Sequence, residues 1–118
     1  MVKLICKDER VYRAAFKNPW YPILIDVYLW IVNRFEKAVV TETWRVPRVH
    51  NDVHSTSPLR AVDLRSWIYA SPEWVEGEIN NNWIYDPDRP LMHVCILHDA
   101  GTGKHLHVQV HDNTFQII

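Results

Sequence analysis

The longest apolar pattern of the chain lies in its first third and repeats with the period of an α-helix. Its apolar positions recur three to four residues apart, at Ile23, Val27, Trp30 and Ile31. A proline at position 22 suits the first turn of a helix, where the missing N–H group would have had no partner. The pattern therefore predicts a helix from Pro22 to Glu36.

A second helix is predicted from Pro72 to about Trp83. Ser71 is a favourable N-cap residue, and the proline after it suits the first helical position. Glu73 then places a negative charge near the positive end of the helix dipole. Gly77 lies inside this helix but does not outweigh the signals at its start.

Short apolar runs predict four strands, at residues 38–41, 59–64, 92–98 and 106–110. The last two are separated by a segment with two glycines, which is typical of an antiparallel hairpin. Residues 1–21 have a mixed pattern, and residues 45–58 hold two prolines and many small polar side chains, so that segment is expected to be a loop. The chain is therefore expected to be α+β, a small and mainly antiparallel sheet with helices packed on one face.

Length and composition limit the classes of protein that fit. The 118 residues make one domain, 1–118, and the 47% apolar share is that of a globular protein. A net charge of −1 gives no support to nucleic-acid binding, and no apolar run is long enough to span a membrane. The N-terminus carries charged residues where a secretory signal needs an apolar core, so we expect synthesis in the cytoplasm without a signal peptide.

Cysteine and tryptophan positions give two further expectations about the interior. Cys6 and Cys95 do not form a C-x-x-C pair, so we expect both to be reduced and Cys95 to be buried. Trp44, Trp67 and Trp83 are expected in the core, because a small domain needs large side chains to fill it.

The last predicted strand carries an unusual row of histidines. Because side chains alternate along a strand, His105, His107, Gln109 and His111 share one face. Leu106, Val108 and Val110 form an ordinary core face on the other side. The H-x-H spacing places two imidazoles side by side, where one or both can bind a metal ion or one can carry protons.

Three segments of the chain together resemble a known superfamily. They are residues 40–45 (VTETWR), residues 54–64 (HSTSPLRAVDL) and residues 104–110 (KHLHVQV). In this order they resemble the zinc peptidases typified by D-alanyl-D-alanine carboxypeptidases and phage L-alanyl-D-glutamate endopeptidases. The hedgehog signalling domain shares the zinc site of these enzymes. The resemblance covers the larger part of the chain.

The resemblance implies a zinc site on the sheet with His54, Asp63 and His107 as its ligands. Two imidazoles and a carboxylate are suitable ligands for a catalytic zinc ion, which keeps a fourth position open for water. His54 and Asp63 are nine positions apart, two more than is usual in the family. Either the loop between them accommodates two extra residues, or His50 is the ligand instead of His54.

The resemblance also implies roles for residues around the metal. Arg45 matches an arginine that binds the substrate's carboxylate, although a surface salt bridge is an alternative. Ser57 would face the substrate or cap a turn, and Arg60 would hydrogen-bond to nearby backbone.

The general base is the least defined of these residues. The family places an acidic residue or a histidine shortly before the last ligand, but Lys104 occupies the position three residues before His107. Asp99 and His105 are therefore the candidate catalytic residues, and His98 is a third.

The sequence thus favours a zinc metallopeptidase that hydrolyses peptidoglycan stem peptides. A phage or prophage origin is expected, with a holin or the virion delivering the enzyme to the cell wall as an endolysin. Two alternatives remain open. One is a non-catalytic zinc-binding module similar to the hedgehog domain, and the other is a structural protein of the virion.

Overall fold

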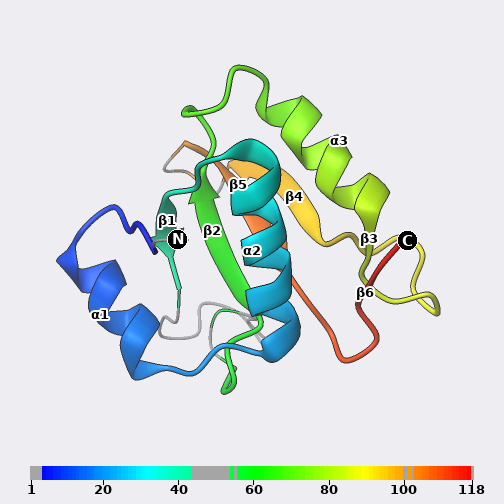
Figure 1. Cartoon of the computed structure of the whole chain (residues 1–118), viewed down its shortest axis with the longest axis horizontal. Coiled ribbons are helices and arrows are strands. Elements are labelled where there is room, and N and C mark those ends of the chain that lie inside the picture. Colours follow the sequence, from blue (N-terminus) through cyan, green and yellow to red (C-terminus); the bar gives the residue numbers. More distant parts are fainter. Residues whose placement is uncertain (1–3, 44–53, 55, 100, 102, 118) are drawn as a thin grey trace.

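The described residues form three helices and six short strands, and the strands make one main sheet with a smaller one beside it (Figure 1). The computed structural model describes residues 4–43, 54, 56–99, 101 and 103–117. In chain order the elements are α1 (Glu9–Lys17), α2 (Pro22–Phe35), β1 (Val40–Glu42), β2 (Ala61–Arg65), α3 (Pro72–Asn82), β3 (Trp83–Ile84), β4 (Cys95–Asp99), β5 (Lys104–Gln109) and β6 (Phe115–Gln116).

The main sheet has the strand order β1-β2-β5-β4, and each neighbouring pair is antiparallel. The short strands β3 and β6 pair separately. This arrangement confirms the predicted α+β fold with a mainly antiparallel sheet. The two central strands, β2 and β5, come from distant parts of the sequence and pair with Asp63 directly opposite His107.

Both predicted helices form, and the signals that predicted them act at their ends. Pro22 occupies the first turn of α2, and Glu36 ends that helix with a left-handed backbone conformation (φ 68°). The Ser71 side chain caps α3 by accepting a hydrogen bond from the Trp74 backbone N–H at 3.2 Å.

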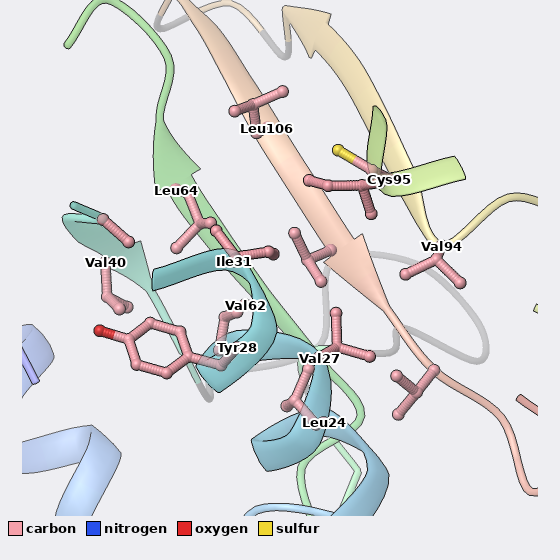
Figure 2. Packing of buried hydrophobic residues seen from close by; sticks show 14 of the residues in the cluster. Leu24, Val27, Tyr28, Ile31, Val40, Val62, Leu64, Val94, Cys95 and Leu106 are labelled. Carbon is pink, nitrogen blue, oxygen red and sulfur yellow. The ribbon is translucent and has the colours of Figure 1, made fainter. Parts of the chain in front are cut away.

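The core lies between α2, α3 and one face of the main sheet. Figure 2 shows Leu24, Val27 and Ile31 of α2 pointing toward Val62 and Leu64 of β2. Leu106 of β5 belongs to the same buried cluster, as do Val75 and Ile79 of α3. Because side chains alternate along each strand, Asp63, Arg65, His105 and His107 lie on the opposite face. We call this opposite surface the site face.

Helix α1 was not predicted, because its segment was interpreted as mixed. It lies beside β1 (Figure 1), away from the face that α2 and α3 cover. Its ends nevertheless carry standard signals, since the Asp8 side chain caps it and Lys17 lies in its last turn. Only Val11 and Ala15 of this helix are buried.

One core prediction is wrong and others are confirmed. Trp67 is 73% exposed, because the chain has left β2 before it and its indole packs under the Arg65 guanidinium instead. Trp83 is buried as predicted, while Trp44 lies outside the described residues.

Both cysteines are free thiols, and Cys95 is buried. No helix among the described residues is long and apolar enough to cross a membrane.

Candidate metal centre

Two of the predicted ligands are placed by the register of the central strands. Asp63 of β2 and His107 of β5 are direct Cα partners and lie on the site face. The Asp63 Oδ1 atom is 3.0 Å from His107 Nδ1. The residues on either side of each ligand point into the core, which holds both strands in this register. They are Val62 and Leu64 on β2, and Leu106 and Val108 on β5.

His54 completes the group from the segment that precedes β2. Its Nε2 atom lies 3.2 Å from Asp63 Oδ1 and 3.3 Å from His107 Nδ1. The ring is almost fully buried, with 1% of the side chain exposed. The structure thus brings together the three residues that the sequence predicted as ligands, whereas His50 lies outside the described residues.

The spacing of these three atoms fits a tetrahedral metal ion. Zinc bonds of about 2.0–2.1 Å in tetrahedral geometry place two ligand atoms about 3.3–3.4 Å apart. The observed separations of 3.0, 3.2 and 3.3 Å are close to that value on all three edges. His54, Asp63 and His107 therefore form a group that can hold a metal ion.

The hydrogen bonds behind the site determine which ring nitrogens carry protons. His54 Nδ1 is 2.8 Å from the Thr43 carbonyl oxygen, which only accepts, so Nδ1 carries the hydrogen and Nε2 presents a lone pair. The Gln109 amide donates its Nε2–H to the His93 carbonyl at 2.9 Å, which turns its Oε1 atom toward His107. His107 Nε2 donates to that oxygen at 3.1 Å, so Nδ1 also presents a lone pair.

Three lone pairs consequently converge on one point, and such an arrangement requires positive charge. The charge is either an additional proton on one imidazole or a metal ion between the three atoms. Without an ion, a ring that takes up the additional proton becomes charged and donates a hydrogen bond to Asp63. Burial acts to raise the pKa of Asp63, but these hydrogen bonds from His107 or His54 and the ring charges lower it more. The pKa of Asp63 thus lies well below its usual range, and the carboxylate is ready to bind a cation.

The other histidines of the hairpin lie beside the three ligands. His98 and His105 are direct Cα partners on β4 and β5, on the same site face as His107. The His98 ring packs edge-on against the His107 ring, with 5.9 Å between their centroids. His105 Nδ1 is 3.4 Å from the Thr41 hydroxyl.

Asp99 is not brought together with these groups. Its Oδ1 atom accepts hydrogen bonds from the backbone N–H groups of Gly101 and Gly103, at 2.8 and 3.1 Å. Both glycines have a positive φ, so the carboxylate stabilises the tight turn of the hairpin. The predicted catalytic role of Asp99 stays a prediction, and the structure gives this side chain a visible structural one.

Of the other residues predicted around the metal, the structure describes Ser57 and Arg60 but not Arg45. Ser57 is exposed, and the Arg60 Nε atom donates to the Val110 carbonyl oxygen at 3.0 Å, which is the backbone contact expected of it. Arg45 lies outside the described residues.

The sequence did not reveal the residues that support the ligands. Gln109 was placed on the ligand face by alternation, but its role in orienting His107 was missed, although its place two residues after a ligand was a usable signal. Nothing in the sequence indicates that the Thr43 carbonyl would hold His54, because that contact depends on the path of the backbone.

No family model, curated protein or solved structure matches this chain.

Proposed function

We propose that this protein is a zinc-dependent peptidase that hydrolyses peptidoglycan stem peptides. The observation that carries the proposal is the convergence of His54 Nε2, Asp63 Oδ1 and His107 Nδ1 at tetrahedral spacing. The described residues supply three protein ligands of this type, a number typical of catalytic zinc, since structural zinc sites are usually closed by four. The order of the sequence motifs supplies the substrate class.

The chain's own residues have separable tasks in this proposal. His54, Asp63 and His107 hold the ion, while the Thr43 carbonyl and Gln109 fix the two rings. When bound, zinc would supply Lewis acidity toward the scissile carbonyl and lower the pKa of a bound water to about 7. His105 and His98, on the same face, are the proposed groups for proton transfer to the leaving nitrogen.

The proposal extends to where the enzyme acts. A peptidase of this class meets its substrate at the cell wall. We propose delivery by a phage or prophage system through a holin or the virion.

Metal analysis and peptide hydrolysis test the proposal together. Purified protein should contain one zinc per chain, and Asp63→Asn and His107→Ala should each lose it. His111→Ala is the matched control, because His111 lies beyond the end of β5, near Asp86. Zinc-loaded protein should release peptides from purified peptidoglycan, a chelator should stop the release, and added zinc should restore it.

A non-catalytic zinc module is the second candidate, and the position of Asp99 favours it. The Asp99 carboxylate accepts hydrogen bonds from the backbone of the hairpin turn, so this carboxylate is not positioned to assist a reaction at the metal. Stoichiometric zinc without hydrolysis of any peptidoglycan would support this module. Absence of zinc, even after addition, would instead favour a structural role in the virion.

A further inference from the structure

Arg65 differs from the other arginines that the structure describes, because its guanidinium has no acceptor. The others each bond to a carboxylate, a carbonyl or a hydroxyl: Arg10 to Glu42, Arg13 to Glu9, Arg34 to Glu78, Arg60 to Val110 and Tyr85, and Arg89 to Asp86. Among the described residues, the Arg65 guanidinium makes no hydrogen bond or ion pair, and it stacks on the face of Trp67, 4.9 Å from the ring centroid.

The position of Arg65 relates it to the metal centre. It follows Asp63 by two residues on β2, so both side chains emerge on the site face, and its Cα partner across the sheet is His105. The Arg65 backbone N–H donates to the Val39 carbonyl, and the Ser66 hydroxyl donates to the Lys104 carbonyl. These hydrogen bonds fix the backbone that carries Arg65 and Trp67.

The stacking with Trp67 leaves the arginine suited to bind a ligand. An indole under one face restricts the guanidinium plane, while the N–H groups along its edge stay available. Trp67 itself is 73% exposed, an unusual position for the largest side chain of a small domain. A planar, oriented and unpaired guanidinium is the group that best matches a carboxylate through two parallel hydrogen bonds.

We propose that Arg65 and Trp67 form a carboxylate subsite for an acidic peptide that lies along the site face. This inference rests on the proposed function in placing the scissile bond at the metal. Arg65 lies two positions after Asp63 on β2, a distance of about 7 Å along the strand. An extended peptide covers that length with about two residues. The carboxylate therefore belongs to a residue about two positions from the cleaved bond.

Binding of short peptides by the zinc-loaded chain tests the subsite. Three probes are compared by calorimetry: acetyl-Ala-Ala with a free carboxylate, the same peptide as its amide, and acetyl-Ala-Glu amide. We expect the wild-type chain to prefer an acid over the neutral peptide by about 10-fold or more. The first and third probes show whether a terminal or a side-chain carboxylate is recognised.

Variants show whether the peptide carboxylate binds to Arg65 or to the metal ion. Arg65→Gln should remove most of the preference, Trp67→Ala should weaken it, and Trp67→Phe should preserve it, with zinc content unchanged in all three. Arg34→Gln is the matched control, because Arg34 is stacked on Trp74 at 5.0 Å but already pairs with Glu78. This control should keep the wild-type preference.

The outcomes distinguish the subsite from the peptidase proposal. An unchanged preference in Arg65→Gln, or an equal loss in Arg34→Gln, overturns the subsite even if the protein is a zinc peptidase. Loss of the preference in Arg65→Gln alone supports the subsite even if no peptidoglycan is hydrolysed.

Discussion

Gln109 shows how a residue outside the His54–Asp63–His107 group can set the protonation of one of its members. Its amide is fixed on one side by the His93 carbonyl, and its oxygen then fixes the protonated nitrogen of His107. Since only the Nε2–H tautomer of His107 leaves a lone pair on the Nδ1 atom that faces Asp63, this amide selects the tautomer that can bind a metal ion.

We predict that Gln109→Leu keeps the binding of one zinc ion but weakens its affinity by about 10–100-fold, the usual effect of losing such an outer partner. Leucine has a similar size, so packing is largely retained, but it cannot accept the hydrogen bond from His107. Competition with a chromogenic chelator measures the affinity. Gln116→Leu, at an exposed position of β6, should bind zinc like the wild type. Equal affinities for Gln109→Leu and the wild type would show that the amide does not orient the ligand.

The two thiols should differ in reactivity, because burial separates them. Cys95 is 1% exposed and its pKa is raised by burial, whereas Cys6 is only partly buried. In the folded protein, a maleimide should therefore label Cys6 and leave Cys95 unmodified. Denaturant should make both react, as mass spectrometry would show. Rapid labelling of Cys95 in the folded chain would contradict its place in the core.

At the scale of elements, two side chains of α3 bond to the backbone of β4 at the edge of the main sheet: Glu76 accepts from the Leu97 N–H at 2.6 Å, and Asn80 bonds twice to Cys95. The Asn80 amide donates to the Cys95 carbonyl at 2.8 Å and accepts from the Cys95 backbone N–H at 2.9 Å. A helix side chain thus takes the place of a further strand beside β4, at the point where β4 begins.

We predict that Asn80→Ala lowers the free energy of unfolding by about 1–3 kcal/mol, because two backbone groups lose their partner. Urea denaturation followed by tryptophan fluorescence measures the change. Asn82→Ala is a suitable comparison, since the Asn82 amide bonds only within α3, to the Glu78 carbonyl. Its effect should be smaller, and the reverse order would refute the attachment.

Element prediction from sequence succeeded where local signals are strong. Pro22 and Ser71 mark the helix starts correctly, and alternation in β5 separates Leu106 from His107. β4 begins at Cys95 and not at residue 92, because the Met92 backbone N–H bonds to the Arg89 carbonyl in a turn. Such a turn depends on tertiary packing as much as on residue type.

The candidate site was predictable to a similar extent. Asp63 and His107 follow from the resemblance of the sequence motifs, and alternation also places His107 on a histidine-rich face. The choice between His54 and His50 depends on a loop path that no periodicity encodes. The unpaired state of Arg65 was also invisible, because a missing partner is a property of the folded surroundings.

At the scale of the whole molecule, the ligand group links distant parts of the chain. His54 and Asp63 are 9 residues apart, and His107 follows Asp63 by 44. An ion held by all three binds the folded chain and not the unfolded one, so it adds to stability by mass action.

We therefore predict that free zinc at about 100 times its dissociation constant raises the free energy of unfolding by about 2.7 kcal/mol. Thermal denaturation with zinc and with a chelator measures the difference. Asp63→Asn should show no zinc-dependent increase, while Arg34→Gln should show the full increase. A zinc-dependent increase that persists in Asp63→Asn would place the ion elsewhere.

The direct pairing of Asp63 with His107 has a consequence for how the sheet is assembled. If β5 slipped by one residue against β2, His107 would turn into the apolar interior and a leucine or valine would face the carboxylate. Only the native alignment offers both ligands at once, so zinc would discriminate against misaligned chains. The ion would therefore stabilise the native register of β2 and β5, whatever else it does in the folded protein.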